Sequence, residues 1–436
     1  MTDVLIVGAG SAGSVLAERL SADPSRRVTV VEAGPGTDDP MVRALTDNAW
    51  SLPIGPNSPV AQSYSTRLTD DPPRVAEIVR GVCLGGSGAI NGCYFWRALP
   101  QDFGAIPGWS WSDVVAHYEA VESRIPARPP AEYSASTTEF VAAAESAGYR
   151  SGLAAVPLNI ADGRRLGPGS VFLEPALDRP NLTVLTRTRV TRMRFSSGRA
   201  VGVDILGPDG SGQLDADRVV LAAGAVATAQ LLMLSGIGPA DQLRALGITA
   251  HVDLPVGQHC WDHPEWVMST EWAPGVDRPV LEVVLNHDDL EIRPYTTGFG
   301  VPSPDLPSPA IGVALMRPRA RGRVSLASAD PTIPPRIAHR YDSEPADVAA
   351  LRRGCEMVAG IIGAATALGE PVWSTSQHLG GTAPMGTDGH AVVDPQCRVR
   401  GVDNLWVIDG SVLPEPLGRG PHATIAMIGH RGADFV

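Results

Sequence analysis

The sequence predicts an α/β fold (α+β overall) in which a domain with a parallel sheet is split along the chain and a second domain, built on an antiparallel sheet, is inserted into it. Residues 4–33 read as strand, glycine-rich turn, helix and second strand, which is the order of a βαβ unit. A strand that runs into a turn and a helix recurs at residues 218–234 and 405–433. Residues 279–340 instead alternate apolar and polar side chains, which is typical of antiparallel strands. Because segments of the first kind flank the alternating one, we expect the first domain to be discontinuous.

The first βα turn carries three glycines at G-x-G-x-x-G spacing. Gly8, Gly10 and Gly13 follow an apolar run that reads as a buried strand. In a Rossmann-like unit the first glycine permits the tight turn, the second lets the backbone approach a pyrophosphate, and the third lets helix and strand pack closely. The helical pattern at residues 14–20 offers free N–H groups and a positive dipole end to the phosphates. The turn predicts a bound dinucleotide, which Ser11 is also expected to contact; the alternative is a glycine-rich turn with no ligand.

An acidic residue stands where a ribose is usually bound. Glu32 ends the second predicted strand, about 20 residues beyond the glycines, and its carboxylate can accept hydrogen bonds from ribose hydroxyls. A carboxylate at this place argues against a 2′-phosphate, and so against NADP. We expect Ala33, the next residue, to contact the cofactor too. The fingerprint alone leaves FAD and NAD open.

Length and composition bound the organisation and the function classes. The chain has 436 residues, too many for one core, so we expect two domains. With 47 acidic and 35 basic residues, the formal charge of −12 disfavours nucleic acid or an anionic membrane as a partner. All 35 basic residues are arginine, and the lack of lysine excludes Schiff-base and P-loop lysine mechanisms. The expected domains are residues 1–267 (with surface excursions near 35–75 and 126–180), 268–377, and 378–436, the last returning to the first domain.

The cysteines predict no site. All five are scattered without a C-x-x-C pair, so we expect neither a zinc site nor a redox dithiol, and no other metal. Reduced thiols in a cytoplasm are the simplest interpretation. No secretory signal is visible, and no apolar run approaches the ~18 residues of a membrane span. We expect a cytoplasmic protein, with peripheral contact to the inner membrane left open.

Further elements are expected along the chain. Residues 35–75 are rich in Pro, Gly, Ser and Asp with weak periodicity, which indicates a long surface excursion such as a lid. Ser112 is the expected N-cap of a helix at residues 113–122. Helices are also expected at residues 140–148, 347–367 and 423–433, and strands at residues 182–195 and 199–206.

Five segments resemble, in order, the signature segments of one family. Residues 80–92 read RGVCLGGSGAING, and residues 224–239 read GAVATAQLLMLSGIGP. Residues 254–264, 378–386 and 392–414 read LPVGQHCWDHP, HLGGTAPMG and VVDPQCRVRGVDNLWVIDGSVLP. With the N-terminal fingerprint, they resemble the glucose–methanol–choline (GMC) oxidoreductases, which are FAD-dependent alcohol dehydrogenases and oxidases. The resemblance runs nearly from end to end and implies an FAD-binding domain with an inserted substrate domain.

Two departures from the family pattern concern the cofactor. Val82 replaces a residue that is usually basic. Some relatives attach FAD covalently through a histidine just before the asparagine that is Asn91 here, and this chain has Ile90 at that position. The resemblance therefore implies FAD bound without a covalent link.

The resemblance assigns cofactor-binding residues to each segment. Glycine is needed where backbone must touch a cofactor. The helix expected near Ala423 can aim its N–H groups at the flavin pyrimidine, and Asp409 matches a position that bonds the ribityl–phosphate region. The implied residues beyond the N-terminal fingerprint are Arg80, Gly85, Gly86, Ser87, Asn91, Gly92, Val190, Ala223, Gly224, Asp409, Gly410, Ala423 and Thr424.

Two histidines match the family's catalytic pair. Oxidising an alcohol needs a base for the O–H proton and an acceptor for hydride, which FAD accepts at its N5. His378 opens the H-x-x-G-T-x-x-M-G segment and is the expected base, with His422 as its partner, although the two roles could be exchanged. His263 is expected to cap or pack near the flavin, and His430 to be structural. Candidates for the substrate pocket are Trp96, Trp261 and Tyr295.

The implied function is oxidation of an alcohol to an aldehyde or ketone, with electrons passed to a quinone, a respiratory carrier or O2. Residues 421–424 and the compact length resemble actinobacterial members linked to mycofactocin, so a reduced redox cofactor is an alternative substrate. A lyase or decarboxylase, a non-catalytic carrier protein and an NAD-linked dehydrogenase stay open as other classes. The sequence leaves open which alcohol is used and whether O2 is the acceptor.

Overall fold

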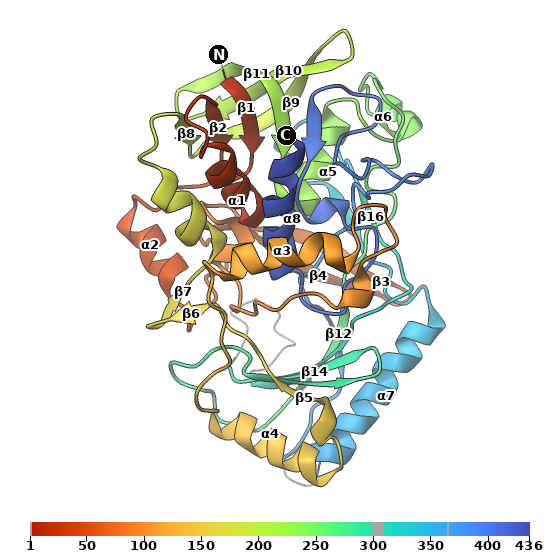
Figure 1. Ribbon diagram of the computed structural model, residues 1–436. Coiled ribbons are helices and arrows are strands. Elements are labelled where there is room, and N and C mark those ends of the chain that lie inside the picture. The colour runs from red at the N-terminus through yellow and green to blue at the C-terminus, as the bar shows by residue number, and fades with distance from the viewer. Residues whose placement is uncertain (1, 298–308, 364–365) are drawn as a thin grey trace.

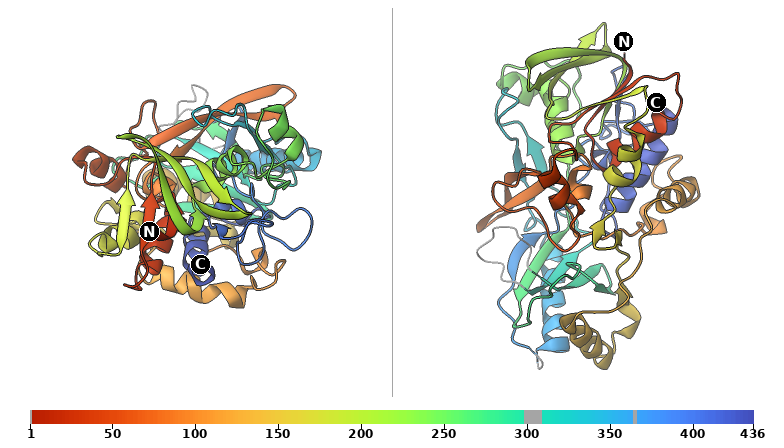
Figure 2. Two further views of the ribbon diagram at one scale, coloured as in Figure 1. Left: turned by 90° about the horizontal axis from the view of Figure 1, so that it is seen from above. Right: turned by 90° about the vertical axis from the view of Figure 1, so that its left-hand side faces the viewer.

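The computed structural model describes residues 2–297, 309–363 and 366–436. The molecule is elongated, with two sheet-based parts placed end to end (Figure 1, Figure 2). One part holds a seven-stranded sheet and both chain ends; the other holds a six-stranded sheet flanked by α4 (Ala135–Ser146) and α7 (Pro345–Ile362). This is the predicted α/β fold, with an antiparallel part inserted into a split part whose sheet is mostly parallel and has two antiparallel strand pairs at one end.

The seven-stranded sheet is built around β1 (Thr2–Val7). The parallel strands β2 (Val28–Val31) and β11 (Gly210–Leu221) flank it, and β19 (Leu405–Val407) is parallel to β11. A segment near the C-terminus therefore returns to the sheet that the N-terminus begins. The order is β8–β2–β1–β11–β10–β9, with β8 (Leu182–Leu185), β9 (Arg189–Ser196) and β10 (Arg199–Gly207).

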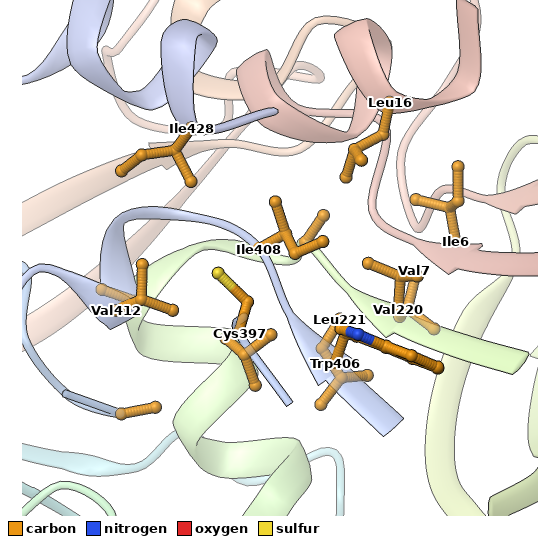
Figure 3. Packing of buried hydrophobic residues seen from close by; sticks show 14 of the residues in the cluster. Ile6, Val7, Leu16, Val220, Leu221, Cys397, Trp406, Ile408, Val412 and Ile428 are labelled. Atoms are coloured by element: carbon orange, nitrogen blue, oxygen red, sulfur yellow. The ribbon is translucent and has the colours of Figure 1, made fainter. Parts of the chain in front are cut away.

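Two helices from opposite ends of the chain lie side by side on this sheet. They are α1 (Ser11–Leu20) and α8 (His422–Gly432), and a Cβ on Gly429 would lie 2.6 Å from a carbonyl oxygen of α1. Leu16 and Ile428 are fully buried between these helices and the sheet (Figure 3). Burying a side chain of this size contributes about 1.5–3 kcal/mol. This packing fixes the start of α8 relative to the glycine turn.

The six-stranded sheet is antiparallel throughout, in the order β18–β12–β15–β14–β13–β5. Phe140 of α4 and Leu351 of α7 are fully buried in one cluster with Ile292 and Val313 of the sheet. The strands are β5 (Leu153–Ala155), β12 (Pro264–Ser269), β13 (Val283–His287), β14 (Leu290–Tyr295), β15 (Ala310–Leu315) and β18 (Val372–Thr375).

The segment at residues 35–75, expected to be a surface excursion with weak periodicity, contains two regular elements that the sequence did not predict, α2 (Pro40–Asp47) and β3 (Ala61–Asp70). In β3 the side chains of Tyr64 and Thr66 are buried while their neighbours face out. Polar residues on both faces hid this period-2 pattern. A four-stranded sheet joins β16 (Arg323–Ser325), β17 (Arg336–Ala338), β3 and β4 (Pro73–Gly81) in that order.

Pairing between distant segments also moves the expected domain limits. The expected limit after residue 267 falls inside β12, and β5, from the excursion expected at 126–180, pairs with β13. No local pattern reveals such a pairing. Within the described ranges, no helix is long and apolar enough to cross a membrane.

Several predicted element ends differ. The helix expected at 113–122 is α3 (Trp111–Glu122), and its N-cap is Ser110 rather than Ser112, because the Asp113 carboxylate accepts a hydrogen bond from the Ser110 amide at 2.8 Å. The helix expected at 140–148 is α4, which begins earlier, at Ala135. The helix expected at 347–367 is α7, and residues 364–365 of that expectation lie outside the described ranges. The strand expected at 182–195 is divided into β8 and β9. The other elements are α5 (Gly224–Leu234), α6 (Ala240–Ala245), β6 (Ile160–Ala161) and β7 (Arg164–Arg165).

Candidate active site

One cavity of about 420 Å³ is lined by residues from both ends of the chain. Its wall includes Gly10 of the first βα turn, Asn91 of the second glycine run, and both His378 and His422. The predicted catalytic histidines and the predicted dinucleotide turn therefore face the same space. Of the predicted cofactor-binding residues, the wall also contains Gly8, Ser11, Glu32, Ala33, Arg80, Gly86, Ser87, Gly92, Val190, Ala223, Gly224, Asp409 and Gly410.

Four predicted cofactor-binding residues lie behind this wall and support it. A Cβ on Gly13 would lie 2.0 Å from a backbone oxygen of the turn, so this glycine serves the close packing of helix on strand. Gly85 has a φ of 94°, the left-handed conformation of a tight turn. Ala423 is buried, and the hydroxyl of Thr424 is 2.6 Å from that of Tyr118.

The backbone of Gly10 has free space in front of it at the place where the two glycine runs meet. A Cβ on Gly86, whose φ is 55°, would lie 2.8 Å from the Cα of Gly10, so the second run packs against the first through glycine. A Cβ on Gly10 itself would have no protein atom nearer than 3.9 Å. Free backbone at the N-terminus of a helix, with room in front of it, fits a pyrophosphate.

Glu32 is a buried carboxylate that still faces the cavity. Its two oxygens accept hydrogen bonds from the backbone amides of Ala9 and Gly34, each at 2.9 Å. Each oxygen keeps lone-pair capacity for a further donor, which fits a ribose hydroxyl. Burial raises the pKa of Glu32 despite the amide donors.

Asp409 joins two distant segments beside the same wall. Its carboxylate accepts from the Gly224 amide at 2.8 Å, the Thr228 hydroxyl at 2.7 Å and the Ser411 amide at 2.8 Å. It thus holds the start of α5 against the chain that follows β19.

Strand pairing brings His378 against His263. β12 and β18 are antiparallel neighbours whose register pairs Pro264 with Thr375, so the residues that flank them lie together. The Nδ1 atoms of the two rings are 2.8 Å apart, and the rings meet edge to face. The Nε2 of His263 is 2.9 Å from the carbonyl oxygen of Leu417.

These contacts assign the tautomers of both rings. A carbonyl only accepts, so the Nε2 of a neutral His263 carries the proton and its Nδ1 is bare. That bare Nδ1 accepts from the Nδ1–H of His378, which leaves the Nε2 of His378 without a proton. His378 is a residue of the cavity wall and keeps one ring nitrogen that can accept a proton.

Burial keeps these imidazoles neutral. It lowers the pKa of His263 to about 4 and that of His378 well below its usual range, and nearby Arg293 lowers both further. Near neutral pH both rings are uncharged, which is the state in which His378 can act as a base.

His422 has the opposite tautomer, with its proton on Nε2. Asn91 accepts from the Cys93 amide at 3.0 Å through its Oδ1, so its NH₂ group faces the Nδ1 of His422 at 2.9 Å. The Nδ1 of His422 therefore accepts and its Nε2 carries the proton. That Nε2 is buried beside Gly88 with no hydrogen-bond partner in the described part of the chain. It is a donor that a bound group would satisfy.

Asp262 anchors the pair of rings from behind. Its Oδ1 accepts from the backbone amides of His263 and His378, both at 2.8 Å. Its Oδ2 accepts from the hydroxyls of Tyr341 at 2.9 Å and Thr375 at 2.5 Å. Among the described residues, every hydrogen bond to this buried carboxylate comes from an uncharged donor.

A buried ion network lies behind part of the cavity wall. Arg293 lies 2.8 Å from a Glu291 oxygen and 3.2 Å from a Glu265 oxygen. Tyr94 and Ser376, which line the cavity, bond to this network: the Tyr94 hydroxyl is 3.1 Å from Glu291, and the Ser376 hydroxyl is 3.0 Å from Glu265. Sequence reasoning missed both residues, since neither belongs to a motif.

The aromatic candidates for the substrate pocket do not line the cavity. Trp261 is buried and donates from its Nε1 to the Leu413 carbonyl at 2.8 Å. Tyr295 is buried with its hydroxyl 2.6 Å from Glu265. Trp96 lies under the guanidinium of Arg419 at 4.4 Å. His263, expected to cap or pack, instead bonds directly to the predicted base.

Comparison with known proteins shows what the whole chain is similar to. Two GMC oxidoreductase family models match residues 2–265 and 318–429. A GMC-type oxidoreductase of Rhodococcus erythropolis is 39% identical over 99% of this chain and 97% of its own, and an alcohol dehydrogenase [acceptor] of Pseudomonas putida is 28% identical over 100% and 96%. Among solved structures, pyridoxine 4-oxidase from Mesorbium loti superposes with a TM-score of 0.88 at 26% identity, covering 100% of this chain and 99% of that one.

The two family models cover most of the chain, and the relatives named above span its whole length. The glycine turn, the second glycine run and the histidine pair occupy one cavity in this structure. The chain belongs to the GMC oxidoreductase family.

Proposed function

We propose that this protein oxidises an alcohol to an aldehyde or ketone with non-covalently bound FAD and passes the electrons to an external acceptor. The observation that carries the proposal is the neutral His378, which lines the same cavity as the dinucleotide turn and whose Nε2 is left without a proton. Relatives named as an alcohol dehydrogenase and an oxygen-dependent choline dehydrogenase support this reaction type.

The residues divide the work along the cavity. Gly10 and the N-terminus of α1 would hold the pyrophosphate, and Glu32 a ribose. Bound FAD supplies the flavin N5 that accepts hydride from the substrate carbon. His378 takes the hydroxyl proton, and the unpaired Nε2–H of His422 donates to an oxygen or a cofactor group beside Gly88.

Anaerobic mixing of the holoenzyme with a panel of primary and secondary alcohols tests the proposal. We expect at least one alcohol to bleach the oxidised flavin and to yield one carbonyl product per flavin. Subsequent addition of O2 or a quinone identifies the acceptor. Reduced mycofactocin belongs in the panel as the narrower alternative substrate. Consumption of a substrate while the flavin stays oxidised would favour lyase or decarboxylase chemistry, and a flavin that no donor reduces would reject the proposal.

Replacement of Gly86 by alanine should weaken FAD binding at least about tenfold, or about 1.4 kcal/mol. The added Cβ would meet the Cα of Gly10 at 2.8 Å, and φ is positive there, so the two glycine runs must separate. Flavin fluorescence during titration of the apoprotein measures the change. Gly360→Ala in α7, where the added Cβ meets nothing within 4 Å, is the matched control. Equal FAD affinity in both variants would contradict the role of the two packed glycine runs in binding FAD.

Acid precipitation should release the yellow flavin into the supernatant. Ile90 lines the cavity just before Asn91 and offers no nucleophile for a covalent link. Absorbance of the supernatant and of the pellet measures the partition. Colour that stays with the precipitated protein would show a covalent bond.

A further inference from the structure

His378 is the outer member of a chain of hydrogen bonds that leads away from the cavity. The chain runs from the bare Nε2 of His378 through the 2.8 Å contact between the Nδ1 atoms to His263, and on to the Leu417 carbonyl at 2.9 Å. His263 is fully buried and does not line the cavity. A proton that reaches His263 is therefore separated from the substrate by one imidazole ring.

We propose that the base is this two-ring unit, and that the proton taken from the substrate comes to rest on His263. The Nε2 of His378 accepts the hydroxyl proton, and the Nδ1–H of His378 is given to the bare Nδ1 of His263. His378 is then neutral with its proton on Nε2, and His263 is an imidazolium that donates to His378 and to the Leu417 carbonyl. One proton enters and none is lost, so the step balances without any electron transfer. The proposal rests on the proposed alcohol oxidation.

The surroundings of the two rings favour the proton on His263. The Asp262 carboxylate, whose hydrogen bonds all come from uncharged donors, adjoins His263 and favours a proton there, Glu291 adds a second negative charge, and Arg293 opposes the two. The charged side chains that act on His378 are Arg293 and Arg80, both cationic. A positive charge is thus stabilised at the inner ring and opposed at the outer one.

Removing the charge from His378 also restores a neutral cavity wall. The ion network behind the wall is already balanced, since Arg293 pairs with Glu265 and Glu291 while Arg419 lies 3.8 Å from a Glu291 oxygen. A lasting imidazolium at His378 would add an unmatched charge to this wall. The relay places that charge next to Asp262 instead.

Nitrogen-15 NMR of the holoenzyme with labelled histidine tests the resting place of the proton without any substrate. Spectra of His263→Asn and His378→Asn assign the two rings among the ten histidines. At neutral pH we expect the proton of His378 on Nδ1 and that of His263 on Nε2. On acidification, the first proton that the pair takes up should make His263 doubly protonated and move the proton of His378 to Nε2. A first imidazolium at His378 would overturn the proposal.

Two variants separate a relay from mere orientation. In His263→Asn, the amide oxygen can still accept from the Nδ1–H of His378 but cannot hold a proton, whereas His263→Phe removes both abilities. We expect both variants to slow flavin reduction by roughly 10- to 100-fold, as part of the about 10²–10⁴-fold effect of a general base. Wild-type rates in His263→Asn would reduce His263 to a positioning residue and overturn the relay.

His430→Gln is the matched control, because His430 forms the same Nδ1 to Nδ1 contact with His117 at 2.9 Å, outside the cavity wall. We expect wild-type rates of flavin reduction in this variant. The two proposals fail separately: if no alcohol reduces the flavin, alcohol oxidation is rejected while the NMR titration still decides where the pair holds its proton.

Discussion

Replacing His378 by glutamine should slow flavin reduction by alcohol about 10²–10⁴-fold, the range by which a positioned general base accelerates proton transfer. Glutamine fills similar space and can keep a hydrogen bond to His263, but it has no basic nitrogen. The loss should fall on the rate constant for flavin reduction, because the proposed role of His378 is to take the proton that leaves during that step. FAD content should stay unchanged, since the two glycine runs proposed to bind FAD lie elsewhere along the wall.

Anaerobic stopped-flow absorbance with the best alcohol of the panel measures this effect. His390→Gln is the control: His390 is exposed and outside the cavity wall, so its rate should match the wild type. His422→Gln should have a smaller effect than His378→Gln, because the Nε2 of His422 carries a proton and donates rather than accepts. A larger loss in His422→Gln would indicate that His422 is the base and His378 the donor.

Features encoded in local sequence were predictable. The G-x-G-x-x-G turn needs only its own neighbours, and Gly8 with a φ of 100° and Gly13 against a backbone oxygen do what their spacing predicts. The resemblance to the GMC oxidoreductases is confirmed by two family models. It also named His378 and His422, which the structure brings to one cavity.

Features that depend on pairing between distant segments were not predictable. His263 and His378 are separated by 115 positions and meet only because β12 pairs with β18 in one register. Arg293 and Glu291 on β14 and Glu265 on β12 look like ordinary strand residues in the sequence. Only the assembled sheet places them together. Tyr94 and Ser376 gained their place in the wall in the same way.

The folded protein should lose stability as the pH falls from about 7 to 5, because several histidines are buried in the neutral form. Burial lowers the pKa of His339 and His422 to about 4, against 6.5 for the unfolded chain. Between these two values the unfolded state binds a proton that the native state does not, so stability is present above pH 6.5 and falls as the pH drops below it. A shift of this size costs about 2 kcal/mol per ring between pH 7 and 5.

His339 allows this cost to be isolated. It lies outside the cavity wall, stacks on Tyr341 at a ring-centroid distance of 4.8 Å, and its Nε2 is buried without a hydrogen-bond partner in the described residues. Phenylalanine keeps the stacked ring and removes both the titration and the unsatisfied nitrogen, whose burial costs about 1–3 kcal/mol. We therefore expect His339→Phe to be at least as stable as the wild type at pH 7 and to lose about 2 kcal/mol less on going to pH 5.

Urea unfolding of both proteins at the two pH values, followed by tryptophan fluorescence, gives the four free energies of unfolding that this comparison needs. The comparison is a difference of differences, so the carboxyls that act in the opposite direction cancel. Burial raises the pKa of Glu32 and Asp409, and each stabilises the fold as the pH falls, equally in both proteins. An unchanged pH dependence in His339→Phe would mean that the folded and unfolded chains protonate His339 over the same pH range, so that burial does not lower its pKa. In that case His339 would become a cation as the pH falls below about 6.5, with its Nδ1 3.8 Å from an Asp262 oxygen, and it would compete with His263 for the carboxylate that favours a proton there.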